Sequence, residues 1–207
     1  MAIISAENKF CFIHIYRTGG TTIQEALRKQ VFDLRILNPL HSTIEYTLDK
    51  FPQVQNYTKF SYVRNPYDLL ISIYTDILTS GKNTDYLHIK DIGFYKFIQW
   101  LYEVGMKREE TSLEPFYRTQ TDSLYINKKS NIDEIYKYET LCNDSGSSSL
   151  FSLFSKLNLR FPNSVPLTKK SDRDISYGDI YDYNTYKLVN TIFKEDFKNF
   201  KYNTYAH

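Results

Sequence analysis

Residues 10–27, FCFIHIYRTGGTTIQEAL, constrain the fold most, because an apolar stretch stops at a glycine pair and resumes at helical spacing. Residues 10–15 are rich in aromatic and β-branched side chains, which predicts a strand. The apolar residues that follow at helical spacing are Ile23, Ala26 and Leu27. A turn with Gly19 and Gly20 between a strand and a helix start lets the backbone approach an anion, because the unpaired N–H groups and the positive end of the helix dipole face it.

The same turn carries side chains suited to oxyanions. The hydroxyl donors are Thr18, Thr21 and Thr22. Arg17 adds a planar, permanently charged fork. The turn is not a Walker A loop, which needs GxxxxGK[ST], because no lysine follows the second glycine.

A second strand–turn–helix segment spans residues 59–74, KFSYVRNPYDLLISIY. Asn65 is placed as the helix cap and Pro66 at the first helical position. The apolar helix positions that follow are Leu69, Leu70, Ile73 and Ile77. Arg64 ends the expected strand, and Ser72 lies two turns into the expected helix.

Together, the two segments resemble the nucleotide-binding motifs of sulfotransferases that use 3′-phosphoadenosine 5′-phosphosulfate (PAPS). In the carbohydrate-type branch these motifs look like FIHIPKTGGTS and FVRNPYDRLVSAY. The resemblance implies that the first loop holds the 5′-phosphosulfate, that Arg64 and Ser72 hold the 3′-phosphate, and that the product is 3′-phosphoadenosine 5′-phosphate (PAP). It also implies an α/β fold: one domain over residues 1–207, with a central, mostly parallel sheet flanked by helices and a P-loop-like strand–turn–helix.

Further matches to this family extend toward the C-terminus. Residues 114–125 are similar to a segment ending in PQ and a short apolar stretch, and residues 135–141 to a strand followed by an E-N-L turn. Residues 167–202 resemble the closing pattern of N-x-S, a tyrosine-rich helix and D-x-x-x-F-x-Y. The resemblance implies contacts to the adenosine or the 3′-phosphate from Ser171 and from one of Lys169 and Arg173, and the choice between these two stays open.

One departure from the family pattern concerns catalysis. Tyr16 and Arg17 stand where the carbohydrate-type motif has Pro-Lys, and the family uses that lysine to stabilise charge on the leaving phosphate. Arginine keeps the charge and occurs in other sulfotransferase branches, including the protein-tyrosine type. It cannot donate a proton near neutral pH. We therefore expect Arg17 to be catalytic through charge alone.

A general base would help by removing the proton of the acceptor, and histidine is the usual choice because its pKa of about 6.5 lies near working pH. His41 is the candidate, since it lies on an expected loop before the expected helix over residues 43–51. Carbohydrate-type sulfotransferases have a histidine in a comparable place. Glu45 and Asp68 are weaker candidates, and His14 is expected to be structural.

Length and composition fit one soluble α/β domain. The 26 basic and 24 acidic residues leave a net charge of +2, which gives no long-range field for nucleic acid. The 16% aromatic residues are expected to serve the core more than a base-stacking surface. Two cysteines make no disulfide framework, no apolar run approaches about 20 residues, and no metal-ligand spacing is present. We expect a cytoplasmic enzyme without metal or membrane anchor.

The acceptor and two other functions remain open. The resemblance suggests a sugar hydroxyl, whereas the small net charge favours a small natural product over a polyanionic glycan. A P-loop kinase of a small metabolite would share the fold but needs a glycine-lysine loop. A non-catalytic nucleotide- or glycan-binding relative is suggested only by Tyr16 and Arg17. The sequence leaves the oligomeric state undetermined.

Overall fold

The computed structural model describes residues 1–38, 42–80, 87–107, 117–141, 148–164 and 177–205. The chain forms two compact units. The first comprises Met1–Arg64 and Gln120–Lys170, and the second comprises Asn65–Thr119 and Ser171–His207. One domain over residues 1–207 stays a prediction, whereas the α/β fold class is confirmed.

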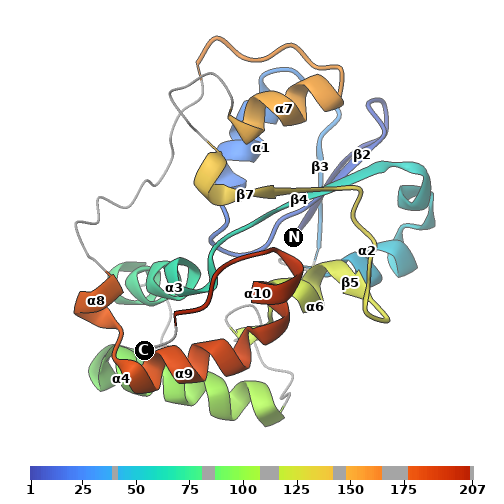
Figure 1. The fold of residues 1–207 in the computed structure, drawn as a ribbon. Coiled ribbons are helices and arrows are strands. Elements are labelled where there is room, and N and C mark those ends of the chain that lie inside the picture. Colours follow the sequence, from blue (N-terminus) through green and yellow to red (C-terminus); the bar gives the residue numbers. More distant parts are fainter. Residues whose placement is uncertain (39–41, 81–86, 108–116, 142–147, 165–176, 206–207) are drawn as a thin grey trace. The chain divides into compact units, whose positions relative to one another are not determined.

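The first unit is built on a five-stranded sheet in the order β3-β1-β2-β4-β7 (Figure 1). Its strands are β1 (Ala2–Ser5), β2 (Phe10–Ile13), β3 (Arg35–Leu37), β4 (Thr58–Val63) and β7 (Glu134–Lys137). Because β1 is antiparallel to both of its neighbours, while β2, β4 and β7 are parallel, four of the five strands run in one direction. The sheet is therefore mixed and mostly parallel, as predicted.

Short helices and a hairpin make up the rest of what is described of the first unit. They are α1 (Gly20–Arg28), α2 (Ile44–Lys50), η1 (Pro52–Asn56), α6 (Gln120–Leu124), the pair β5 (Tyr125–Ile126) and β6 (Lys129–Ser130), η3 (Tyr138–Thr140) and α7 (Ser149–Lys156). The predicted helix over residues 43–51 is confirmed as α2, which Thr43 caps by accepting a hydrogen bond from the backbone N–H of Tyr46. The apolar spacing of residues 150–157 predicts an amphipathic helix, which corresponds to α7.

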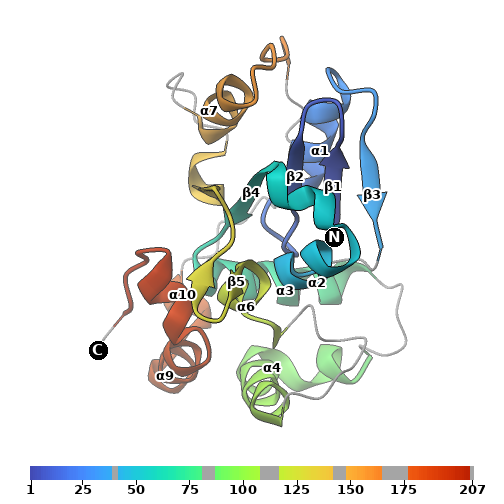
Figure 2. The ribbon, with the colours of Figure 1, turned by 90° about the vertical axis from the view of Figure 1, so that its right-hand side faces the viewer.

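Strand β1 was not anticipated. The sequence prediction began the sheet at Phe10, but Ala2–Ser5 pairs along its whole length with Phe10–Ile13. Four residues are too few for a periodic signal, so their pairing depends on the partner strand. β3 then lies beside β1 at the edge of the sheet (Figure 2).

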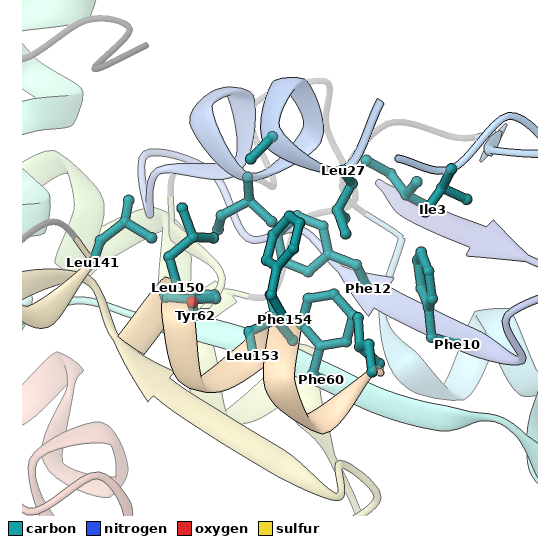
Figure 3. Packing of buried hydrophobic residues seen from close by; sticks show 14 of the residues in the cluster. Ile3, Phe10, Phe12, Leu27, Phe60, Tyr62, Leu141, Leu150, Leu153 and Phe154 are labelled. Atoms are coloured by element: carbon teal, nitrogen blue, oxygen red, sulfur yellow. The ribbon is translucent and has the colours of Figure 1, made fainter. Parts of the chain in front are cut away.

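The core of the first unit joins α1 and α7 to one face of the sheet. Phe12 and Phe60 are register partners on neighbouring strands, and their rings stack with centroids 5.0 Å apart. Figure 3 shows Leu27 of α1 and Phe154 of α7 reaching this pair of rings. On the other face of the same strands, residues such as Cys11 are also buried. Burial on both faces is typical of parallel α/β sheets.

The described part of the second unit is helical. The helices described there are α3 (Pro66–Ser80), α4 (Leu87–Lys107), α8 (Tyr177–Ile180), α9 (Tyr183–Ile192) and α10 (Lys194–Asn199). The predicted helix after Asn65 is confirmed as α3, and the Asn65 side chain accepts the backbone N–H of Tyr67 at 3.0 Å. α4 packs along α9 (Figure 1).

One prediction in this unit was wrong. Residues 82–92 lack clear periodicity, which predicts a surface excursion before an aromatic-rich helix over residues 94–104, but the chain is helical from Leu87. Gly93, with φ of 75°, separates two helical stretches within α4. The break hid the first stretch, because it interrupts the helical spacing. The part of the excursion before Leu87 lies outside the described residues. So does most of residues 143–149, NDSGSSS, whose composition predicts a flexible loop.

Candidate functional site

The candidate site begins with the turn between β2 and α1. Arg17 and Gly19 both have left-handed backbone conformations, with φ of 60° and 84°. This conformation costs an L-residue such as arginine roughly 1–2 kcal/mol, so the surrounding structure must hold Arg17 in place. Thr18, which is fully buried, helps by donating its hydroxyl to the carbonyl of Ile15 at 2.9 Å.

The glycine pair has an internal reason for lacking side chains. A Cβ at Gly20 would lie 2.0 Å from atoms of the His14 ring, and a Cβ at Gly19 would lie 2.8 Å from the Leu141 side chain and 3.0 Å from Tyr138. Real Cβ atoms do not approach neighbours this closely. The sequence pattern alone predicts that these glycines allow a ligand to approach the backbone. The structure shows that the protein's own side chains occupy the space that their Cβ atoms would need.

The ring of His14 packs against this turn, and its structural role stays a prediction. Its ring stacks on Phe12 with centroids 5.6 Å apart and lies against the first residue of α1. The helix has no acidic residue in its first turn, and its N-cap, Gly19, supplies no side-chain hydrogen bond. Helix N–H groups in such a position can bind an anion.

The end of β4 places Arg64 against this turn. Nη1 of Arg64 donates a hydrogen bond to the carbonyl oxygen of Arg17 at 2.9 Å, so two predicted site residues meet. The guanidinium also lies over the ring of Tyr138, 4.1 Å from the centroid, in a cation–π contact. Arg64 is only 6% exposed. The arrangement places positive charge at the turn. The side chain of Arg64, at the end of the neighbouring strand, also supports the turn through its hydrogen bond.

The remaining predicted residues are distributed as follows. Thr22 is buried at the start of α1, whereas Thr21 is exposed. Ser72 lies on α3 in the second unit, with a side chain that is 1% exposed. Glu45 is exposed on α2 and Asp68 is half-buried on α3. The predicted residues outside the described part of the chain are His41, Lys169, Ser171 and Arg173.

Sequence reasoning assigned no role to Tyr138 or to Gln120, whose side chain holds the backbone of Arg64. Tyr138 directly follows β7, which is parallel to β4. The carboxyl ends of neighbouring parallel strands meet at one edge of a sheet, and ligands bind there. That rule could have identified Tyr138. Nothing in the local pattern around Gln120 indicates its contact.

The described part of the chain contains one buried cysteine thiol and no cluster of metal-ligand side chains. Burial raises the pKa of the Cys11 thiol to about 12, so it is not a nucleophile near neutral pH. Among the described residues, no three histidine, cysteine, aspartate or glutamate side chains are grouped so as to hold a metal ion. Within the same residues, no helix is both long enough and apolar enough to cross a membrane.

Comparison with known proteins agrees with the motifs. Searches among curated proteins and among solved structures found no match. A family model described as "Sulfotransferase family" matches residues 1–203, which is nearly the whole sequence. A match of this extent, over a chain whose two motifs meet at the Arg17–Arg64 hydrogen bond, shows that the chain belongs to the sulfotransferase family.

Proposed function

We propose that this protein is a PAPS-dependent sulfotransferase that moves the sulfuryl group to a hydroxyl of a small molecule or a carbohydrate. The observation that carries the proposal is the junction between the left-handed turn at Arg17 and the guanidinium of Arg64. An anion-binding turn alone suits many nucleotides. A buried arginine from the next parallel strand, in the position of the family's 3′-phosphate motif, favours a donor with a second phosphate.

The turn would hold the 5′-phosphosulfate. Because the hydroxyl of Thr18 donates to Ile15, we assign its backbone N–H, rather than the hydroxyl, to the ligand, together with those of Gly19 and Gly20. The hydroxyl of the exposed Thr21 is the side-chain donor best placed to reach a ligand, and Thr22 takes a supporting role. The first turn of α1 adds the positive end of its dipole.

Arg17 would stabilise the charge that grows on the leaving phosphate. Sulfuryl transfer passes in line from one oxygen to another, so the protein mainly positions the partners and stabilises charge. An arginine does so without giving up a proton. Arg17→Ala should therefore lower kcat by about 10²–10³-fold, as removal of a transition-state donor does, with a smaller loss in donor affinity. Arg17→Lys should retain activity.

The general base and the remaining nucleotide contacts are proposed from the resemblance to the sulfotransferase family. We propose His41 as the general base, and Ser72, Ser171 and one of Lys169 and Arg173 as further nucleotide contacts. His41→Ala should lower kcat by about 10²–10⁴-fold and leave PAP binding unchanged, because a base acts on the acceptor. The wild-type rate should fall at acidic pH as His41 takes up a proton.

We place the enzyme in the cytoplasm, because it has few cysteines.

Titration calorimetry with PAP, AMP and ATP tests the donor. The wild type should bind PAP at least about tenfold better than AMP, because a hydrogen bond to a charged group contributes about 1.5–3 kcal/mol. Arg64→Ala should remove most of this difference, whereas Arg35→Ala, at an exposed arginine on β3, should not change it. Equal affinity for PAP and AMP would refute the proposal, and a preference for ATP would favour the kinase.

A further inference from the structure

The side chain of Gln120 binds the backbone at the position where the chain leaves the first unit. The chain passes out of this unit after Arg64 and returns to it at Gln120. These two residues, 56 positions apart, are joined by a pair of hydrogen bonds. The backbone N–H of Arg64 donates to Oε1 of Gln120 at 2.8 Å, and Nε2 of Gln120 donates to the carbonyl of Arg64, also at 2.8 Å.

The side-chain amide of Gln120 gives the Arg64 backbone the two hydrogen bonds that a neighbouring strand would otherwise provide. β4 ends at Val63, whose register partner on β7 is Lys137, so Arg64 lies one residue beyond the ladder. Buried backbone N–H and C=O groups need partners, and leaving one without costs about 1–3 kcal/mol. A primary amide has both an acceptor and a donor, so one glutamine satisfies both groups. Gln120 is fully buried, which keeps water from competing for these bonds.

The fixed backbone of Arg64 in turn supports the turn at Arg17, which is the proposed donor turn. With its backbone fixed, Arg64 directs its guanidinium to the Arg17 carbonyl and over the Tyr138 ring. Arg17 has a backbone conformation that a non-glycine residue rarely adopts without support. Gln120, Arg64 and Arg17 therefore form a continuous chain of hydrogen bonds that ends at the turn.

We infer that Gln120 is a positioning residue for the donor site: its amide fixes Arg64, and through Arg64 the turn at Arg17. The link to the donor rests on the proposed function, but the link to Arg64 does not. Gln120 needs no contact with the nucleotide for this role. Its loss should change how the folded protein binds PAP, and not only how stable the protein is.

The first experiment needs no ligand. Amide hydrogen exchange is compared in the wild type, in Gln120→Ala and in Leu124→Ala, which removes a fully buried side chain of the same helix. Gln120→Ala should speed exchange of the Arg64 amide about tenfold or more, the equivalent of one lost hydrogen bond. Leu124→Ala should lower the melting temperature without this local effect. Unchanged protection of the Arg64 amide in folded Gln120→Ala would overturn the inference.

The second experiment measures PAP affinity below the melting temperature of every variant. Gln120→Ala should bind PAP about tenfold more weakly or worse, while Leu124→Ala stays within about twofold of the wild type. Equal losses in the two variants would mean that Gln120 acts through stability alone, which contradicts the inference. A wild type that binds no PAP would refute the proposed function instead, and the exchange experiment would still decide the role of Gln120.

Gln120→Glu makes the test independent of whether the alanine variant folds. A protonated carboxyl has one donor and one acceptor, so it can replace the amide, whereas a carboxylate only accepts and would face the Arg64 carbonyl. The PAP affinity of Gln120→Glu, relative to the wild type, should therefore fall as pH rises. Gln53→Glu, at an exposed position on η1, controls for the added charge. A ratio that does not change with pH would contradict the role of the donor atom.

Discussion

The two units differ in how their cores are held together. In the first, phenylalanines and aliphatic side chains pack between the sheet and two helices, around Phe12 and Phe60. In the second, Tyr67 is fully buried among aromatic rings and also makes hydrogen bonds through its hydroxyl. Its aromatic neighbours are Tyr181, Tyr186, Phe197 and Tyr205. Close packing is therefore the main constraint around Phe12 and Phe60, whereas around Tyr67 satisfied polar groups are an added constraint.

The motif that follows β4 contributes to both kinds of core. Arg64 supports the turn at Arg17 in the first unit, and Tyr67, three residues later, lies at the centre of an aromatic cluster in the second. The Tyr67 hydroxyl donates to the Asn190 side chain and accepts the backbone N–H of Tyr205 at 3.0 Å, and its carbonyl accepts the hydroxyl of Tyr181 at 2.7 Å. Burial raises the pKa of Tyr67 above its usual value, so the hydroxyl keeps its proton.

The largest expected effect tests the steric constraint in the first unit. Gly20→Ala should destabilise the protein by about 3 kcal/mol, because the new methyl group collides with the His14 ring. Removing that ring should make room, so the double variant Gly20→Ala/His14→Ala should be more stable than Gly20→Ala. Denaturant unfolding of the wild type, Gly20→Ala, His14→Ala and the double variant measures the cost of Gly20→Ala and the effect of removing the ring. If the second substitution lowers stability further, the ring is not what excludes a side chain at Gly20.

The next effect tests the hydrogen bonds of the second unit. Tyr67→Phe keeps the ring and removes the hydroxyl that serves Asn190 and Tyr205, so it should cost about 1–3 kcal/mol. Tyr95→Phe is the matched control, since Tyr95 is exposed and its hydroxyl accepts only a surface hydrogen bond from Gln99. It should change stability by less than about 0.5 kcal/mol. Equal effects in thermal unfolding would remove the contrast between the units.

Two helix caps offer a smaller and matched comparison. Ser148 caps α7 in the first unit, and Asp182 caps α9 in the second with a capping box to Thr185. Replacing either cap by alanine should cost about 0.5–2 kcal/mol at pH 7. Hydrogen bonds from the backbone and side chain of Thr185 lower the pKa of Asp182 below its usual value.

Only the aspartate cap should depend on pH. Because the folded pKa of Asp182 is lowered, its contribution is complete above the unfolded value of about 3.9 and is lost as pH falls through the folded value. The difference in melting temperature between wild type and Asp182→Ala should therefore shrink at strongly acidic pH, while that for Ser148→Ala should not. A pH-independent difference for Asp182→Ala would show that the charge contributes nothing to the cap.

The smallest effect reports on the packed core of the first unit. The pKa of Cys11 near 12 leaves almost no thiolate at pH 7, so a disulfide reagent should not modify it in the native protein. The measurement needs a Cys142→Ser background, because Cys142 is the second cysteine. Reaction should appear only with global unfolding. Modification at native conditions would mean that this core opens locally.

Sequence was informative wherever local chemistry decides the structure. The turn after Ile13 and the helix after Asn65 follow from glycine, proline and apolar spacing, so both were predicted close to their observed positions. Contacts between distant segments left no such signal. The amide of Gln120 on Arg64 depends on how segments far apart in the sequence come together, and the contact of the His14 ring with Gly20 depends on the path of the turn between them. No spacing rule joins residues that are 56 positions apart.

The contact between His14 and Gly20 also restricts how such sequences can vary. The two positions share one volume, because the imidazole occupies the space that a side chain at position 20 would need. A relative with alanine or serine at the equivalent of Gly20 should carry a smaller residue than histidine at the equivalent of His14. A smaller residue can therefore replace His14 while position 20 is still glycine. A larger residue cannot replace Gly20 while position 14 is still histidine.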